Sequence, residues 1–116
     1  MLNTVSLAGR IAQTPVLQRT SGDSAYVRFS IACDRDYRQA DKPREADFIP
    51  CMAWRQTAEF LCQHFQKGSP VIITGRLEVN SWKTPDGEQH REMLVSVDNV
   101  YFGESKPKEA QTPAQV

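Results

Sequence analysis

Two aromatic side chains, Phe48 and Trp54, lie in one predicted strand on the face away from its apolar stripe. They are six positions apart, so the two-residue period of a strand directs both to the same side, roughly 20 Å from each other. The opposite side carries Ile49, Cys51 and Ala53. Planar rings that a core does not use are groups on which nucleobases can stack.

Two more aromatic residues stand at positions where little core is available. Trp82 is followed by Lys83 and by the turn-forming residues 84–87, which places it near the end of a hairpin. Tyr37 is flanked by arginines in the charged segment 34–47, which is predicted to be an exposed loop. A tyrosine in that setting can combine stacking with cation–π contact.

Cations near these aromatics, or at non-core positions of the predicted strands, could follow the phosphates of a nucleic acid. The candidates are Arg10, Arg28, Arg55, Arg76 and Lys83. Unpaired DNA exposes both bases and phosphates, so rings interleaved with cations favour binding of single strands without readout of sequence. The formal net charge of zero counts against a protein that holds duplex DNA by bulk attraction.

Each of these assignments competes with an ordinary structural role. Phe48 or Trp54 alone could belong to a core or to a subunit contact, and Tyr37 could be a loop residue without a ligand. A single arginine is more often a solvated surface charge than a DNA contact.

The pattern of apolar residues predicts an all-β domain. The clearest alternation runs through residues 26–33, where one face carries Val27, Phe29, Ile31 and Cys33. Further strands are expected at residues 3–17 with a bulge or bend at Gly9, at 48–54, at 71–82, and around Met93, Val95 and Val97.

One helix is predicted at residues 57–66, between the third and fourth strands, with Glu59 in its first turn. Its apolar stripe consists of Ala58, Leu61, Cys62 and Phe65. This order of elements predicts a five-stranded oligonucleotide/oligosaccharide-binding (OB) barrel. We expect a single OB-fold domain over residues 1–103 and a short disordered tail over residues 104–116, which are poor in apolar side chains.

The cysteines and the hydropathy indicate a cellular compartment. Three cysteines, an odd number in a chain without a recognisable export signal, predict free thiols in a reducing environment. No apolar run approaches the roughly 20 residues that cross a bilayer. The expected location is the cytoplasm, in association with the nucleoid.

Enzymatic chemistry is not indicated by the sequence. His64 and His90 are the only histidines, and Cys62 is too close to His64 and too isolated from other ligands to build a metal site. The chain shows neither a glycine-rich phosphate loop nor a nucleophile elbow. We therefore expect no catalytic residue, no metal and no cofactor.

Three stretches of the sequence resemble the DNA-binding domain of bacterial single-stranded DNA-binding proteins. They are Asn-Thr-Val-Ser-Leu-Ala-Gly-Arg at residues 3–10, Val-Arg-Phe-Ser-Ile-Ala at 27–32, and the end of the predicted helix, which leads through Lys-Gly-Ser into Gly-Arg-Leu at 75–77. The resemblance extends from residue 2 to about residue 102. It implies an OB-fold protein that binds and protects single-stranded DNA in replication, recombination or repair.

The resemblance also implies roles for particular positions and for the assembly. The family's stacking aromatics fall on Tyr37, Phe48, Trp54 and Trp82, and all four positions are aromatic here. It further implies a homotetramer in which the first strand pairs across a dimer contact and DNA wraps around the assembly. Ile49 replaces a histidine that is usual in the family, which puts in doubt any tetramer contact made by that histidine.

A second departure from the family concerns the C-terminus. Members typically carry a glycine-rich linker and an acidic tip that recruits replication and repair enzymes, whereas this sequence ends in Thr-Pro-Ala-Gln-Val at residues 112–116. Recruitment through such a tip is expected to be absent. An alternative function stays open, namely an OB-fold module for protein interaction in a primosome or a mobile-element replication complex, which the zero net charge favours.

Overall fold

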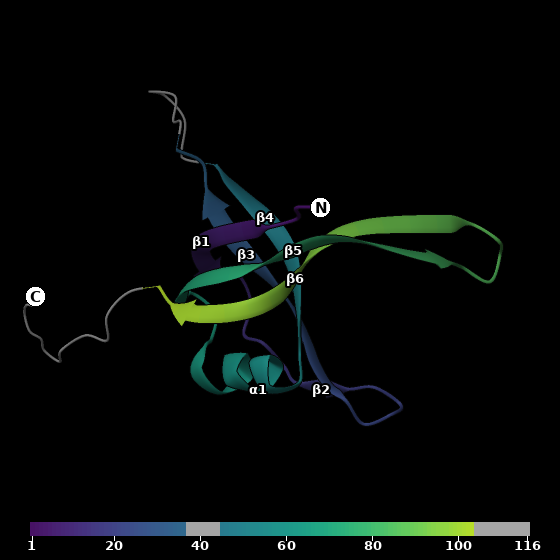
Figure 1. Ribbon diagram of the computed structural model, residues 1–116, viewed down its shortest axis with the longest axis horizontal. Coiled ribbons are helices and arrows are strands. Elements are labelled where there is room, and N and C mark those ends of the chain that lie inside the picture. Colours follow the sequence, from purple (N-terminus) through teal and green to yellow (C-terminus); the bar gives the residue numbers. More distant parts are fainter. Residues whose placement is uncertain (37–44, 104–116) are drawn as a thin grey trace, which may run out of the picture.

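The computed structural model describes residues 1–36 and 45–103. Over these residues the chain forms six strands and one helix (Figure 1), which are β1 (Val5–Ile11), β2 (Gln18–Arg19), β3 (Ala25–Asp34), β4 (Ala46–Trp54), α1 (Arg55–His64), β5 (Pro70–Lys83) and β6 (Gln89–Phe102). The predicted tail at residues 104–116 lies outside the described residues.

The strands form one sheet that closes on itself. Their order is β1-β5-β6-β4-β3-β2, and β1 returns to pair with β3 at Arg10 and Ile11. All neighbours are antiparallel except β4 and β6, which run parallel where Cys51 faces Val95 and Met52 faces Ser96. The predicted all-β OB barrel, with its helix between the third and fourth long strands, is confirmed. The two-residue β2, which pairs with β3, was not predicted.

Closure of the sheet depends on two glycines. A Cβ added at Gly9 would collide with the backbone carbonyl of Ala32, and one added at Gly75 would collide with that of Ser96. The ladder of β5 and β6 shifts its register at Thr74/Gly75, whereas β1 pairs with β5 in constant register from Val5 to Arg10. Of the bulge or bend predicted at Gly9, the bulge is not found in the pairing of β1 with β5, and Gly9 permits close approach of β1 to β3.

The core is built from the inward faces of the strands and one face of α1. Val27 and Ile31 of β3, Ala53 of β4 and Ile73 of β5 are fully buried. Helix α1 packs against β3, β4 and β6 and covers one end of the barrel (Figure 1). At roughly 25 cal/mol per Å² of apolar surface, this burial supplies the main stabilisation of the domain.

Helix α1 begins and ends two residues earlier than predicted. It starts at Arg55, directly after β4, because Arg55 adopts a left-handed backbone conformation with φ of 55° that turns the chain out of the strand. Glu59 consequently lies beyond the first turn, which contains no acidic residue. The predicted apolar stripe is largely confirmed, since Ala58, Leu61 and Phe65 are buried.

All three cysteines are free thiols, as predicted. Cys51 is buried in the core, and this burial, with a smaller contribution from Cys33, raises the pKa of Cys51 to about 12. Burial also raises the pKa of Cys33 and of Cys62. The thiols therefore stay protonated at neutral pH and pack as small apolar groups.

The outer parts of β5 and β6 form a hairpin that extends away from the barrel (Figure 1). Its turn is closed by a hydrogen bond from the Thr84 N–H to the Glu88 carbonyl at 2.8 Å, and Gly87 adopts a φ of 91°. Leu77, an apolar position of the predicted strand, is exposed here because no core lies behind the hairpin. Within the described part of the chain, no helix has the length and apolar character needed to cross a membrane.

Candidate nucleic-acid interface

The outward face of β3 and β4 carries both aromatics that were predicted to share a side. Cross-strand partners on this face are Ala32 with Phe48, Ser30 with Pro50, Arg28 with Met52 and Tyr26 with Trp54. Phe48 is 64% exposed and Trp54 is 41% exposed. We call this surface, made of these eight residues, the β3–β4 platform.

The position of Pro50 explains why a proline is tolerated in this strand. β4 pairs with β6 only at Cys51 and Met52, so at Pro50 the strand has β3 on one side and no ladder recorded on the other. A proline is compatible with a strand where its missing N–H is not required.

Trp54 stacks against Tyr26, its cross-strand partner on the outward face of β3. The two ring centroids are 5.3 Å apart and the planes are inclined by 35°. The Tyr26 hydroxyl donates to the Gln18 side chain at 2.9 Å. These contacts hold Trp54 in place while leaving part of its surface open, which suits a ring that receives a ligand.

Trp82 lies near the end of the hairpin and is 45% exposed. It stacks on its cross-strand partner His90, with centroids 5.5 Å apart and planes inclined by 20°. The His90 Nε2 is 3.4 Å from the Glu88 carboxylate. The pairing of His90 with Trp82 follows from the hairpin register, which the Thr84–Gly87 turn could have suggested.

An ion pair joins the hairpin to the β3–β4 platform. The Arg28 guanidinium on β3 donates to the Glu92 carboxylate on β6 at 2.6 Å, with both side chains partly exposed. Glu92 is two residues from His90, so it lies on the same hairpin face as the Trp82–His90 pair. Glu92 was not identified from the sequence, because a contact over 64 positions leaves no local signal.

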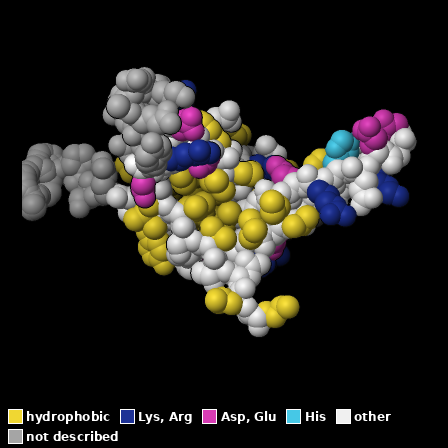
Figure 2. Space-filling view, turned by 90° about the horizontal axis from the view of Figure 1, so that it is seen from above, with side chains coloured by type: hydrophobic (Ala, Val, Ile, Leu, Met, Phe, Trp, Pro, Cys, Tyr) yellow, Lys and Arg dark blue, Asp and Glu magenta, His cyan; other side chains and the backbone are white. Residues whose placement is uncertain are grey.

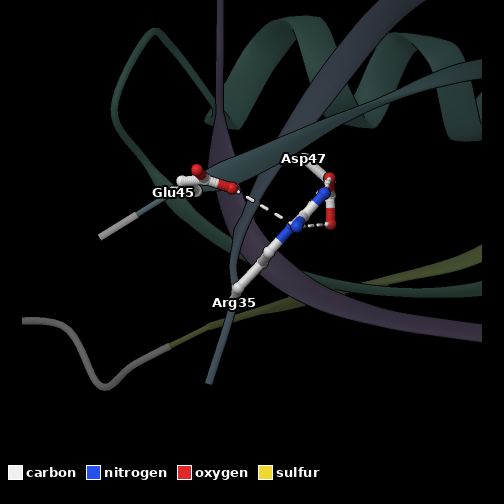
Figure 3. Close-up of polar contacts among 3 residues, drawn as sticks. All are labelled: Arg35, Glu45 and Asp47. Atoms are coloured by element: carbon white, nitrogen blue, oxygen red, sulfur yellow. Dashed lines mark hydrogen bonds and ion pairs between the residues drawn. The ribbon is translucent and has the colours of Figure 1, made fainter. Parts of the chain in front are cut away.

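A second group of charged residues flanks the segment that contains Tyr37. Arg35, just after β3, contacts Asp47 near the start of β4 at 3.0 Å and Glu45, which directly precedes β4, at 3.3 Å (Figure 3). The hydrogen bond from Arg35 holds the pKa of Asp47 below its usual value. The pair is therefore intact at neutral pH and is lost only as the pH falls through that lowered pKa. Tyr37 itself lies outside the described residues.

The register aligns two of the predicted cations with the platform. Arg10 faces Ala32, which in turn faces Phe48. Arg76 faces Ser96, and Ser96 faces Met52 of the platform.

The predicted cations differ in their contacts. Arg10 donates to the Gly68 carbonyl at 3.0 Å, Arg28 is paired with Glu92, and Arg76 contacts Glu78 at 3.0 Å. Within residues 1–36 and 45–103, no hydrogen bond or ion pair is recorded for the side chains of Arg55 and Lys83. Among the described residues, two of the predicted cations therefore have no recorded internal partner and three already have one.

Comparison with known proteins assigns the family. The model of the single-strand binding protein family matches residues 2–103. The chain belongs to this family. The match covers the whole OB barrel, from the residues before β1 to the end of β6.

Relatives in the single-strand binding protein family support the assignment. The chain is similar to a single-stranded DNA-binding protein of Fusobacterium nucleatum, with 38% identity over 96% of this chain and 73% of the relative. It is also similar to the single-stranded DNA-binding protein B of Bacillus subtilis, with 36% identity over 94% of this chain and 96% of the relative. A third relative, from Oceanobacillus iheyensis, is 39% identical over 91% of this chain and 66% of its own length.

Ile49, which the resemblance aligns with a histidine position, lies on the inward side of β4. Its side chain is partly buried and packs against the core cluster of the barrel. An isoleucine there adds apolar contact inside the protomer and offers no hydrogen bond to a neighbour.

Proposed function

We propose that this protein binds single-stranded DNA without reading its sequence, and thereby protects unpaired DNA in replication, recombination or repair. The observation that carries the proposal is the β3–β4 platform, where Phe48 and Trp54 are exposed on one face between aligned arginines. Membership of the single-strand binding protein family supports it. The same membership favours DNA over the alternative of a protein-interaction module.

Stacking supplies the main attraction in this proposal. Phe48, Trp54 and Trp82 each receive a base, and Tyr37 contributes a further ring from the segment between β3 and β4. Each base stacked on an aromatic side chain stabilises complexes of single-strand-binding proteins by about 1–3 kcal/mol. Three or four such contacts together offset the loss of freedom when a flexible strand is held.

The five cations follow the phosphates between the stacked bases. In the proposed complex Arg55 and Lys83 meet phosphates directly, whereas Arg10, Arg28 and Arg76 exchange an internal acceptor for a phosphate oxygen. Each neutralised phosphate releases a counterion, so affinity falls as salt rises. The protein works by binding alone, without catalysis or cofactor, and does so in the cytoplasm with the nucleoid.

We further propose that the protein acts as a homotetramer around which DNA wraps. The edge of β1 away from β5 has no partner from Val5 to Gly9 within the described chain, so it can pair with the same strand of a second copy. A second surface is apolar and lies on the hairpin face opposite Trp82, where Leu77, Val79 and Met93 are exposed. Hydrophobic side chains also gather over the body beside the hairpin (Figure 2).

Tryptophan fluorescence tests the proposed function directly, because the chain has only two tryptophans and both are proposed to stack on bases. We expect oligo-dT to quench the emission to saturation, with affinity falling as salt increases and with little response to a duplex of equal length. Oligonucleotides of increasing length give the site size, and light scattering of the free protein gives the number of subunits. An absence of quenching and of any gel shift at low salt would contradict the proposal.

A further inference from the structure

Arg55 adopts a backbone conformation that its residue type disfavours. Among the described residues that are not glycine, only Asp23 and Arg55 have positive φ, at 67° and 55°. Aspartate visits the left-handed region comparatively often, because its short polar side chain can hydrogen-bond locally. Arginine has no such compensation, so a glycine would fit this point of the chain better.

The position carries a second cost for a cation. Arg55 is the first residue of α1, and the N-terminal end of a helix carries partial positive charge. No acidic residue lies in the first turn, and the residue before it, Trp54, provides no side-chain cap. The charge of Arg55 is therefore placed where the helix disfavours it.

Nothing within the described residues compensates Arg55 for these costs. Its side chain is exposed, and no hydrogen bond or ion pair is recorded for it between residues 1–36 and 45–103. Arg28 and Arg76, by contrast, each contact a carboxylate. A residue that is held in a disfavoured backbone conformation without a stabilising contact inside the protein indicates that its side chain has a functional role.

We propose that Arg55 contacts the phosphate next to the base stacked on Trp54, and that the fold gives up stability to keep a cation at this point. The inference rests on the proposed binding of single-stranded DNA. Trp54 directly precedes Arg55 and is partly open to a base. Arg55, whose guanidinium is exposed, therefore follows the stacking ring directly in the sequence. When a base of the DNA strand stacks on Trp54, the neighbouring phosphate must pass close to Arg55.

The substitution Arg55→Gly tests both halves of the proposal. Glycine relieves the left-handed strain and removes the charge, so we expect the melting temperature of the free protein to rise by about 4 °C. We expect affinity for oligo-dT to fall about three- to tenfold. The slope of log affinity against log salt should become shallower by about 0.7, the value for one phosphate contact on a single strand.

Three matched variants separate charge from conformation. Arg55→Lys keeps the charge and the strained backbone, so its melting temperature should match the wild type and its affinity should stay within about twofold of it. Asp23→Gly relieves the same backbone conformation in a turn remote from Trp54, and should leave the salt slope unchanged. Arg19→Gln removes one exposed positive charge from β2, and should leave both affinity and salt slope unchanged.

The outcomes distinguish this inference from the function on which it rests. If the wild type binds oligo-dT and Arg55→Gly binds with the same affinity and slope, the phosphate contact is wrong while the function stands. A lower melting temperature for Arg55→Gly would show that the position is not costly, and would overturn the proposed exchange of stability for binding. Failure of the wild type itself to bind would remove the function and the inference together.

Discussion

The two regions that present aromatic rings differ in what lies behind them. The β3–β4 platform is the outer face of a sheet whose inner face carries the buried residues Val27, Phe29 and Ile31. The outer hairpin has no buried residue from Val79 to Met93, and is held by its ladder and by cross-strand pairs such as Trp82 with His90. Rings on the platform are therefore fixed by the core, whereas rings on the hairpin can move with it.

This difference suggests a division of labour in holding a flexible strand. The β3–β4 platform is fixed by the core, so it loses little conformational entropy on binding. The outer hairpin can change its position to contact a DNA strand that arrives in many conformations. The Arg28–Glu92 ion pair is the polar contact recorded between the two regions in the described chain.

Stability should depend on the platform side of the molecule. Ile31→Ala leaves a cavity at a fully buried position, and we expect it to lower the free energy of unfolding by about 2–4 kcal/mol. Val79→Ala, at an exposed hairpin position, should change it by less than about 0.5 kcal/mol. Urea unfolding of the free protein measures both. Equal losses of unfolding free energy in the two variants would mean that the hairpin contributes as much to stability as the core of the barrel.

Binding of single-stranded DNA should depend most on Trp54, because its ring is held in place by Tyr26. Trp54→Ala removes a stacking surface that Tyr26 already holds in place, and we expect a loss of about 2 kcal/mol, or roughly 30-fold in affinity for oligo-dT. Phe102→Leu is the matched control, since Phe102 is also exposed but packs beside α1 against Phe65. Loss of affinity in the control and not in Trp54→Ala would relocate the binding face.

Trp82→Ala should weaken binding less, by about 1 kcal/mol or roughly fivefold. One side of the Trp82 ring is already covered by His90, and the hairpin must lose freedom when it closes on DNA. Because there are two tryptophans, Trp54→Phe and Trp82→Phe each leave a single emitter that reports on one region. If the titration gave stronger quenching and higher affinity for the variant that keeps Trp82 than for the variant that keeps Trp54, the hairpin would be the main binding region.

The smallest expected effect concerns the ion pair between the regions. Glu92→Gln removes the carboxylate that competes with phosphate for Arg28, so affinity for oligo-dT should rise about threefold. The matched substitution Glu59→Gln removes the same charge from α1, where no ion pair is recorded with any described residue, and should have no effect. A weaker complex for Glu92→Gln would mean that the pair positions Arg28 for DNA.

Local patterns were sufficient to predict most of the fold. Alternation of apolar residues identified β3 and the two faces of β4, and the Thr84–Gly87 turn identified the hairpin. The start of α1 was misplaced because Arg55 adopts a left-handed conformation that its residue type disfavours. Leu77 lies in the predicted strand 71–82 and is apolar, yet it is exposed, because strand periodicity does not show where a barrel ends.

The surroundings of the site were harder to predict than its rings. Exposure of Phe48 and Trp54 followed from the two-residue period, which is a local property. The pairing of Arg28 with Glu92 depends on the closure of the barrel, so sequence analysis could not show that this cation already has a partner. The stacking of Tyr26 on Trp54 depends likewise on the register of β3 and β4.

The internal pairing of these arginines also bears on which polyanions the protein can hold. Inorganic polyphosphate and sulfated polysaccharides offer negative charge but no bases, so at Arg28 and Arg76 they must displace the carboxylates of Glu92 and Glu78 while the rings stay empty. A molecule without net charge gains little from such an exchange. We therefore expect the two ion pairs to weaken binding of base-free polyanions at Arg28 and Arg76 relative to single-stranded DNA, whose bases can also stack on the rings.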